Sequence, residues 1–259
     1  MEHTAFISHG KDSLAMLEAI KILGLKLDRI VTVDIWATPT IRGELPEMVE
    51  FKQKADKIIF DRYGIKVEHL RAKLSYEEHF YLELYNKRYN QKQIYGFPLV
   101  KGAWCNDRLK MRPLKEIQKG DIIQYLGIAC DEPKRIERHK HKKNIVLPLV
   151  EIGWTEKDCY KFCEDNNLLS PSYSSSFRDG CWFCHNQGIE SLRALRKNHP
   201  EYWQLLLKWD SDSPVPFKPD GHTVHDFDER FRLEDEMLID PSASFRWKML
   251  KEPLQMRLF

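Results

Sequence analysis

The chain has 259 residues, of which 42% are hydrophobic and 31% charged, and its formal net charge is only +2. A chain of this length can bury a substantial core in one domain with appended helices, and its small net charge gives no general electrostatic argument for nucleic-acid binding. No run of 18 apolar residues is present and the N-terminus lacks the organisation of a signal peptide, so we expect no membrane partner.

A polar run follows the first predicted strand, Thr4–Ile7, and precedes the apolar residues of a buried helix. This run is Ser8-His9-Gly10-Lys11-Asp12-Ser13. A strand-to-helix junction directs backbone N–H groups and the positive end of the helix dipole at one point, which suits an anion. Gly10 permits close backbone approach, Lys11 adds a positive charge, and the two serines add hydroxyl donors. A di- or triphosphate fits this run; an ordinary capped strand–turn–helix is the alternative.

Strands and helices alternate through the first two-thirds of the chain. The predicted strands cover residues 29–35, 65–70, 121–129 and 144–150, and the predicted helices begin at Pro46 or cover residues 76–89 and 103–118. This alternation predicts an α/β fold with a mostly parallel, doubly wound sheet, whose ligands gather outside the carboxyl ends of the strands. Asp34 lies at the end of the second of these strands and Asp131 follows a later one, although a helix cap or a solvated loop acid is an equal alternative for Asp34.

The last third of the chain is predicted to be mainly helical. Residues 155–158 resemble a capping box, residues 188–209 form a long amphipathic helix that Pro200 divides, and a final helix covers residues 226–237. Residues 211–221 are rich in Pro, Ser and Asp and are predicted to form a loop. We therefore expect a nucleotide-binding α/β domain over residues 1–153 and a mainly helical region over residues 154–259.

The six cysteines include a C-x-x-C pair, Cys181-Trp182-Phe183-Cys184. Two thiolates at this spacing can bind one metal ion or one cluster edge, but a redox pair and two buried small residues are also open interpretations. Because no secretory signal accompanies the cysteines, we expect reduced thiols or metal ligands in a cytoplasmic protein.

The run at residues 8–13 resembles the S-x-G-K-D-S signature of the PP-loop, or adenine nucleotide alpha-hydrolase-like, superfamily. It is not a Walker P-loop, which has a longer G-x-x-x-x-G-K-[ST] run. In the superfamily this loop holds the pyrophosphate end of ATP, so the resemblance implies nucleotide contacts from all six residues. His9 stands where Gly is common, and either an imidazole over the phosphates or a wider turn would account for it.

Further elements resemble the PAPS-reductase-like branch of that superfamily, including its phage, mobile-element and DNA-phosphorothioation (DndC-type) members. They are W-C-x-x-x-L-K-x-R-P at residues 104–113, G-I-x-x-D-E-x-x-R at residues 127–135, G-C-x-x-C at residues 180–184, and the neighbourhood of Thr38, Glu44, Pro46 and Glu47. The resemblance covers about residues 4–200. It implies further phosphate or nucleotide contacts from Lys110, Arg112, Asp131 and Arg135, with ordinary salt bridges as the alternative for the basic residues.

Two departures from the branch affect the expected chemistry. Ala129-Cys130 replaces the Arg usual before the D-E pair, and the C-terminal E-C-G-I-H nucleophile of true PAPS reductases is absent from the sequence. Attack on PAPS by a recycled cysteine is therefore not expected, and ATP or a metal-bound sulfur intermediate is favoured.

Cys105, Cys181 and Cys184 match the cysteine positions of the branch. The resemblance implies a [4Fe–4S] cluster on these three thiolates, with structural zinc as the alternative. Candidates for a fourth ligand are His185, Cys130 and Cys163, although Cys163 and Cys159 also fit as small core residues on one helix.

The segment Arg135–Lys143 is strongly basic. It is either a solvated loop or a mobile lid that approaches a phosphate-rich partner, the nucleotide or a nucleic-acid backbone.

The resulting hypothesis is an enzyme that binds ATP with Mg²⁺ and cleaves it between the alpha and beta phosphates. Lys11, Asp12 and Ser13 would be catalytic, Asp34 or Asp12 would hold Mg²⁺ or the nucleotide, and a sulfur donor would displace the adenylated acceptor. The alternatives are an adenylyl-sulfate (PAPS or APS) reductase or sulfotransfer activity, and a non-catalytic nucleotide-binding subunit of a DNA-modification or defence complex. Neither the sulfur donor nor the acceptor can be named from the sequence.

Overall fold

The computed structural model describes residues 1–86, 90–98, 103–173, 179–242, 245 and 247. The chain forms two compact units: unit 1 contains Met1–Tyr76 and Cys105–Ser175, and unit 2 contains Glu77–Trp104 and Ser176–Phe259. The boundary expected after residue 153 therefore falls inside unit 1. The reason is that the next helix, α7 (Glu156–Asp165), packs against α1 (Lys11–Ile22) of the same unit.

Unit 1 is built on a five-stranded parallel sheet, which confirms the predicted α/β fold. The strands are β1 (Glu2–Phe6), β2 (Arg29–Asp34), β3 (Val67–Arg71), β6 (Ile122–Leu126) and β7 (Ile145–Val146). Their order is β3-β2-β1-β6-β7, and every neighbouring pair is parallel. The chain winds outward from β1 through β2 to β3 and then returns to β6 on the other side of β1. The carboxyl ends of β1 and β6 therefore flank a topological switch point, where sheets of this kind bind ligands.

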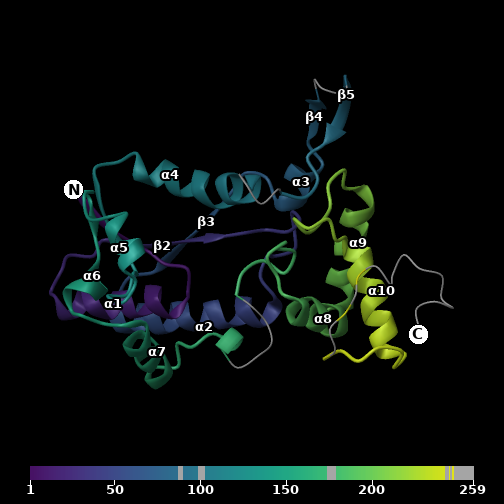
Figure 1. The fold of residues 1–259 in the computed structure, drawn as a ribbon. Coiled ribbons are helices and arrows are strands. Elements are labelled where there is room, and N and C mark those ends of the chain that lie inside the picture. The colour runs from purple at the N-terminus through teal and green to yellow at the C-terminus, as the bar shows by residue number, and fades with distance from the viewer. Residues whose placement is uncertain (87–89, 99–102, 174–178, 243–244, 246, 248–259) are drawn as a thin grey trace. The chain divides into compact units, whose positions relative to one another are not determined.

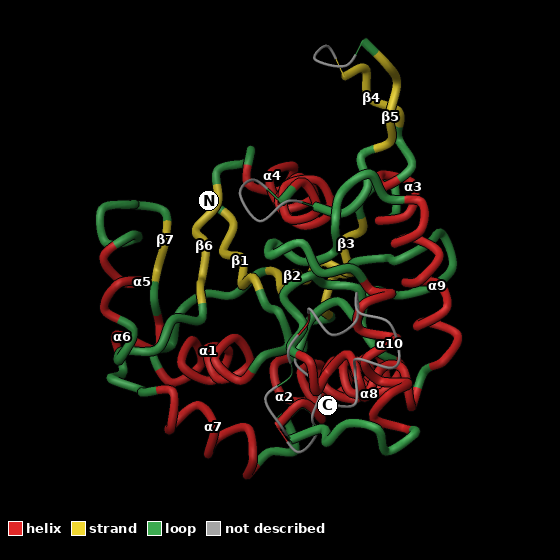
Figure 2. The backbone as a smooth tube through the Cα atoms, turned by 45° about the vertical axis from the view of Figure 1, so that its right-hand side comes forward, coloured by secondary structure: helices red, strands yellow, loops and turns green. Residues whose placement is uncertain are grey.

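Helices cover both faces of this sheet. Figure 1 and Figure 2 show α1 and α2 (Pro46–Tyr63) on one face and α4 (Arg112–Gln118) on the other. The shorter elements of unit 1 are a π-helix at Asn106–Met111, α5 (Pro133–Glu137), α6 (Pro148–Glu151) and a 3₁₀ turn at Pro171–Tyr173.

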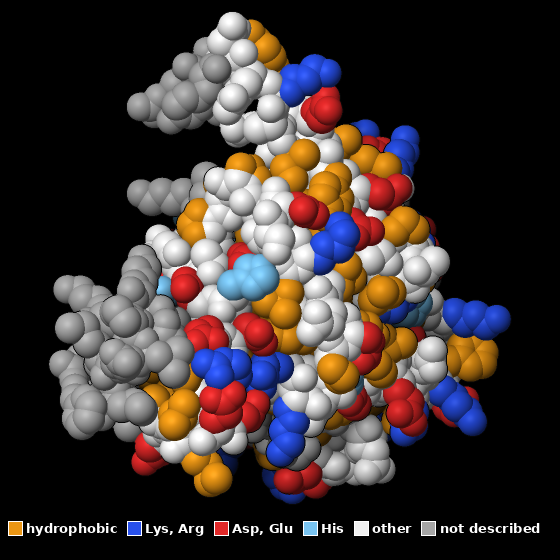
Figure 3. Space-filling model, turned by 90° about the vertical axis from the view of Figure 1, so that its right-hand side faces the viewer, with side chains coloured by type: hydrophobic (Ala, Val, Ile, Leu, Met, Phe, Trp, Pro, Cys, Tyr) orange, Lys and Arg blue, Asp and Glu red, His pale blue; other side chains and the backbone are white. Residues whose placement is uncertain are grey.

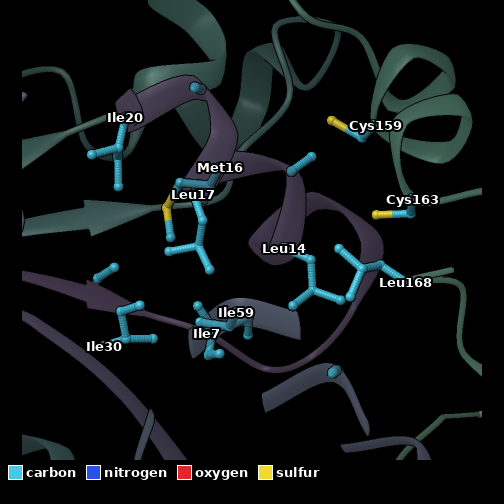
Figure 4. Close-up of a cluster of buried hydrophobic side chains, with 14 of the residues drawn as sticks. Ile7, Leu14, Met16, Leu17, Ile20, Ile30, Ile59, Cys159, Cys163 and Leu168 are labelled. Carbon is cyan, nitrogen blue, oxygen red and sulfur yellow. The ribbon is translucent and has the colours of Figure 1, made fainter. Parts of the chain in front are cut away.

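The core of unit 1 surrounds α1 (Figure 4). Leu14, Met16 and Leu17 are almost fully buried, and Cys159 and Cys163 of α7 lie in the same cluster. Because the sheet covers one side of α1 and α7 another, α1 is apolar on most of its surface and not only along one stripe. Burial on both sides fixes the first turn of α1 relative to the ends of β1 and β6.

Unit 2 is mainly helical, as predicted for the C-terminal region. It contains most of α3 (Tyr76–Phe80), a hairpin of β4 (Glu83–Asn86) and β5 (Gln91–Ile94), α8 (Ile189–Asn198), α9 (Pro200–Asp212) and α10 (Val224–Asp235). Acidic and basic side chains adjoin on the face drawn in Figure 3, and Arg196 and Arg232 of this unit each pair with two carboxylates. No helix in the described part of the chain is both long and apolar enough to cross a membrane.

Three sequence predictions about elements were wrong in part. The helix expected over residues 76–89 ends at Phe80, and a hairpin follows whose turn includes Asn90 with a left-handed φ of 50°; residues 87–89 lie outside the described residues. The strand expected over residues 144–150 ends at Val146, because Pro148 begins a helix. The helix expected over residues 103–118 contains a π-helical segment just before the α4 turn that Pro113 opens.

The predicted helix signals in the last third are confirmed. Thr155 and Asp158 form a reciprocal capping box at the start of α7, and Pro200 begins α9 directly after α8.

Candidate functional site

Residues 8–13, here called loop 8–13, connect β1 to α1 at the switch point. Gly10 is the N-cap of α1 and no side chain among the described residues caps the helix there. The Ser13 Oγ donates a hydrogen bond to the Gly10 carbonyl at 2.8 Å and accepts one from the Ser8 N–H at 3.1 Å. The serine hydroxyls therefore close the loop, and no side chain of the described residues caps the first-turn amides of α1.

His9 points into unit 1. It has a left-handed φ of 60°, its side chain is fully buried, and its Nε2 lies 2.7 Å from Asp56 Oδ1 on α2. Burial lowers the pKa of His9, so the ring is neutral. Of the two interpretations of His9, this geometry matches the wider turn.

Lys11 is held at the loop by two carboxylates. Its Nζ lies 2.7 Å from Asp12 Oδ1 and 3.3 Å from Glu156 Oε2, the latter at the start of α7. Burial alone would lower the pKa of Lys11, but the hydrogen bond to Asp12 and the charges of both acids outweigh it and raise the pKa. Burial, with Glu156 and Glu132 nearby, raises the pKa of Asp12. Lys11 thus stays charged, and a phosphate would compete with these carboxylates for it.

The loop after β6 lies directly against the first turn of α1. A Cβ atom added to Gly127 would be 2.7 Å from both the Asp12 carbonyl oxygen and the Ser13 Cα, which is closer than real side chains approach. Only glycine allows this approach of two backbones. The same loop carries Asp131, whose Oδ1 accepts the Glu156 N–H at 3.1 Å, so Asp131 caps α7.

Arg135, Lys110 and Arg112 are exposed. Arg135 pairs with Glu132 at 2.6 Å on α5, and Arg112 pairs with Asp107 at 3.0 Å across the π-helix. These contacts match the salt-bridge alternative, and phosphate contacts from the three basic residues stay a prediction. Burial lowers the pKa of His139, and the positive charges of Lys142, Arg135 and Arg138 lower it further.

Asp34, the last residue of β2, is 5% exposed and surrounded by cationic groups. Its carboxylate lies 2.6 Å from Arg42, 2.8 Å from His69 Nδ1 and 3.3 Å from Lys52. Burial alone would raise the pKa of Asp34, but His69, Lys52 and Arg42 together hold it well below its usual range. These three cationic groups engage the oxygens of Asp34, and a contact from Asp34 to Mg²⁺ or to the nucleotide stays a prediction.

Sequence reasoning missed the partners of Asp34. His69 was placed on the third strand by its alternation, but nothing in the sequence links it to Asp56 or Lys52 of α2. The proximity of His69 to Asp34 follows from the register of β2 and β3, which pairs Thr32 with His69 and Asp34 with Arg71.

The C-x-x-C pair lies in unit 2 on a tight turn, in which the Cys184 N–H donates to the Cys181 carbonyl at 3.1 Å. Trp182 between them is buried and stacks on Tyr202 and Trp209, with ring centroids 5.0 and 5.5 Å apart. Both cysteines are half-buried, unlike Trp182 and Phe183. The two inner residues therefore anchor the turn in the core, while the two cysteines are more exposed than they are.

The carbonyls beside this turn are fixed by Lys218, a half-buried cation. Lys218 Nζ donates to the carbonyls of His185 and Gln187 at 2.6 and 2.5 Å. His185 is 6% exposed, its Nδ1 has no hydrogen-bond partner among the described residues, and burial followed by the charge of Lys218 lowers its pKa. A neutral imidazole with an available nitrogen is the form that binds metals.

All six cysteines lie among the described residues and carry thiols, not disulfides. Burial raises the pKa of both Cys159 and Cys163 to about 12, which matches their interpretation as small core residues. In the part of the chain that the structure describes, no group of three or more His, Cys, Asp and Glu side chains is arranged to hold a metal ion. Cys105 belongs to unit 1 and the C-x-x-C pair to unit 2, so their joint ligation stays a prediction.

A cleft of about 480 Å³ lies in unit 1 between α2 on one side and α7 with the segment after it on the other. Its described lining consists of Glu47, Glu50, Phe51, Lys54, Tyr160, Leu169, Ser170, Pro171 and Tyr173. No residue of loop 8–13 belongs to that described lining, so the sequence prediction did not anticipate this cleft.

Comparisons with known proteins give remote likenesses. No protein-family model matches the chain. Over 69 residues the chain is 36% identical to the uncharacterized nin region protein ORF290 of Escherichia phage lambda, a match that spans 25% of this chain and 22% of the phage protein. Because the match covers so small a part of that relative, it assigns no function to this chain.

Among solved structures, the chain is similar to the U34-tRNA thiolase NcsA from Methanococcus maripaludis, determined with its [4Fe-4S] cluster. The identity is 15%, the match covers 89% of this chain and 80% of that chain, and the TM-score is 0.38. At this distance the likeness assigns neither activity nor cofactor. The parallel sheet defines the class, an α/β protein in which loop 8–13 lies at the switch point of the strand order.

Proposed function

We propose that the chain binds an adenine nucleotide on loop 8–13 and is a PP-loop ATP pyrophosphatase or PAPS-reductase-like enzyme that supports sulfur transfer. The observation that carries this proposal is the uncapped first turn of α1, which lies at the switch point with Gly127 pressed against it. Uncapped amides at a helix N-terminus, beside a lysine, suit a polyphosphate.

The roles of the loop residues follow from their contacts. The amides of Lys11, Asp12 and Ser13 would bind the beta and gamma phosphates, and the ammonium of Lys11 would exchange a carboxylate for a phosphate oxygen. Asp12 is the better candidate for Mg²⁺, since Asp34 is already neutralised by Arg42, Lys52 and His69. Ser8 and Ser13 would keep the loop closed around the ligand.

The proposed reaction begins with attack of an acceptor oxygen on the alpha phosphorus of ATP. The bond between that phosphorus and the oxygen bridging to the beta phosphorus breaks, and its electron pair leaves with pyrophosphate. The amides of α1 and Lys11 would stabilise the charge on this leaving group. A sulfur nucleophile then displaces AMP from the adenylated acceptor.

The thiol donors fit the metal half of the proposal. Cys181 and Cys184 are half-buried on a turn that Trp182 anchors, and Cys105 is the third ligand that the family resemblance implies. A [4Fe–4S] cluster with three cysteine ligands would supply an open position on iron where sulfur could bind. Zinc on the same thiolates would instead have a structural role.

The test measures ATP and PAPS binding by calorimetry and pyrophosphate release by the anaerobically purified protein. We expect ATP binding and pyrophosphate release that depends on Mg²⁺ and on an acceptor. Tight ATP binding without turnover with any acceptor tried would contradict the enzyme hypothesis and support the alternative, a non-catalytic nucleotide-binding subunit. Absence of binding of both nucleotides would show that the assignment of loop 8–13 is wrong.

A further inference from the structure

A chain of alternating imidazoles and carboxylates runs beside loop 8–13. His9 Nε2 lies 2.7 Å from Asp56 Oδ1, and Asp56 Oδ2 lies 2.8 Å from His69 Nε2. His69 Nδ1 in turn lies 2.8 Å from Asp34 Oδ2. The four residues come from the loop after β1, from α2, from β3 and from the end of β2, so the chain connects four elements at the carboxyl edge of the sheet.

The contacts fix where the protons are. Both ring nitrogens of His69 face carboxylate oxygens, which only accept hydrogen bonds, so both nitrogens must donate and His69 is an imidazolium. His9 must donate from Nε2 to Asp56, and its buried Nδ1 has no hydrogen-bond partner among the described residues. His9 is therefore the neutral tautomer with its proton on Nε2.

The pKa directions agree with this assignment. The hydrogen bonds to Asp34 and Asp56 raise the pKa of His69 to about 9. Burial alone would raise the pKa of Asp56, but the hydrogen bonds from His69 and His9 outweigh it and lower the pKa to about 2.

The groups around His69 are balanced in charge only while it is protonated. Besides Asp34 and Asp56, the cluster contains Lys52 of α2 and Arg42 and Glu44 of the loop before α2, with Lys52 2.6 Å from Glu44. Three cations thus face three carboxylates. Loss of the His69 proton would leave one uncompensated negative charge beside the loop that is proposed to bind phosphates.

The neighbours of His69 on β3 have partners of their own. Glu68 pairs with Arg29 at 2.6 Å, and the guanidinium of Arg71 lies 4.0 Å from the centroid of the Trp36 ring. On α4, which also packs against β3, Lys115 pairs with Asp107 and Lys119 with Glu116.

The chain of hydrogen bonds ends at His9, whose backbone conformation belongs to loop 8–13. A left-handed φ is uncommon for a residue with a side chain and persists where the surroundings fix it. At His9 the fixing contact is Asp56, which His69 holds from its other oxygen.

We propose that His69 is a positioning residue for the nucleotide loop: as an imidazolium it joins Asp34 to Asp56, and Asp56 fixes His9 so that loop 8–13 presents its amides to phosphate. This role rests on the proposed function, since it concerns nucleotide binding by the same loop. His69 itself does not contact the ligand.

The dependence on pH has a definite sign. The pKa of His69 is raised on folding, so its contribution is complete below its ordinary pKa and is lost as the pH rises through about 9. Deprotonation removes one donor from the chain and adds a net negative charge, and both changes weaken phosphate binding. Lys11, whose pKa is raised above its usual value, keeps its charge over the same range.

The experiment measures ATP affinity by calorimetry from about pH 7.5 to 10 for the wild type, His69→Gln and His69→Arg. Wild-type affinity should fall about tenfold over this range, the effect of one lost charge-assisted hydrogen bond. His69→Gln should bind about tenfold more weakly at the lower pH and show no such fall. His69→Arg, which keeps a cation at every pH, should bind more tightly than His69→Gln at the upper end.

His3→Gln is the matched control. His3 lies near the amino end of β1, where its Nδ1 is 2.8 Å from the Tyr125 hydroxyl, far along the strand from the loop. Its pH profile should follow that of the wild type. A second readout is a ¹⁵N correlation spectrum, in which both His69 nitrogens should carry protons at about pH 8.

The outcomes separate the two proposals. Absence of ATP and PAPS binding by the wild type at about pH 7.5 overturns the proposed function. Normal wild-type binding with a His69→Gln profile that superimposes on it overturns the role of His69 alone. A single protonated nitrogen on His69 in the spectrum also overturns that role.

Discussion

Individual residues set the chemistry of loop 8–13, and the most exacting positions are Lys11, Ser13 and Gly127. Lys11 pairs with two carboxylates, those of Asp12 and Glu156. Ser13 closes the loop through its hydroxyl, and Gly127 brings a second backbone against the first turn of α1. Each role predicts a different balance between loss of binding and loss of stability.

Replacing Lys11 or Ser13 by Ala should lower ATP affinity by different routes. Lys11→Ala removes one charge-assisted phosphate contact, worth about 1.5–3 kcal/mol, and should leave the melting temperature nearly unchanged. Ser13→Ala removes two hydrogen bonds within the loop and should lower both affinity and stability, the latter by about 1 kcal/mol. Calorimetry measures the ATP affinity and thermal unfolding measures the stability of both variants.

Lys21→Ala, at the other end of α1, is the control. Equal effects of Lys11→Ala and Lys21→Ala on ATP affinity would contradict the role of Lys11.

Gly127→Ala should displace the first turn of α1. The added Cβ would lie 2.7 Å from backbone atoms, which cannot rotate away, so ATP affinity should fall at least about tenfold and the melting temperature should drop. Gly120→Ala is the control, because a Cβ there meets nothing closer than 3.6 Å. If Gly127→Ala binds ATP as the wild type does, the switch point is not the ligand site.

At the scale of elements, the placement of loop 8–13 depends on α7. Its first turn supplies Glu156 to Lys11, and Cys163 donates to the Lys11 carbonyl at 3.3 Å. The capping box of Thr155 and Asp158 fixes where this helix begins. A change at that cap should therefore reach the loop without touching it.

Thr155→Ala should destabilise the protein by about 1 kcal/mol and weaken ATP binding. Thr223→Ala is a closely matched control, since Thr223 forms the same capping box with Asp226 at the start of α10 in unit 2. Its cost in stability should be similar, but ATP affinity should not change. Chemical denaturation and calorimetry compare the two variants, and equal losses of affinity would refute the link through α7.

The elements also show how far the sequence led. The strand–loop–helix start, the capping box at Thr155 and the break at Pro200 depend on local signals and were predicted correctly. The hairpin of β4 and β5 was missed because Tyr81 and Tyr85 suggested a helical aromatic face, whereas their surroundings in unit 2 decide the outcome. Asp34 was found as a candidate, but its bonds to His69 and Lys52 depend on strand register and helix packing, which a single sequence does not encode locally.

At the scale of the whole molecule, the proposed cluster requires cysteines from both units. An anaerobically purified sample should show broad visible absorption and contain iron and sulfide, and Cys105→Ser, Cys181→Ser and Cys184→Ser should each lose iron. Cys159→Ala, a change in the core of unit 1, should keep it. Zinc in place of iron would make the site structural and would leave only the nucleotide half of the proposed function.

Unit 2 consists of two separate stretches of chain, residues 77–104 and 176–259. The first carries Phe80 and Phe97, whose rings lie 6.0 Å from Trp209 and 5.1 Å from Phe217 of the second. During synthesis the early stretch leaves the ribosome long before the late one exists, so its aromatic surface stays uncovered while the sheet of unit 1 is completed. Shortening the gene to end before the late stretch would make this exposure permanent, and such a fragment should aggregate even though every strand of its sheet is present.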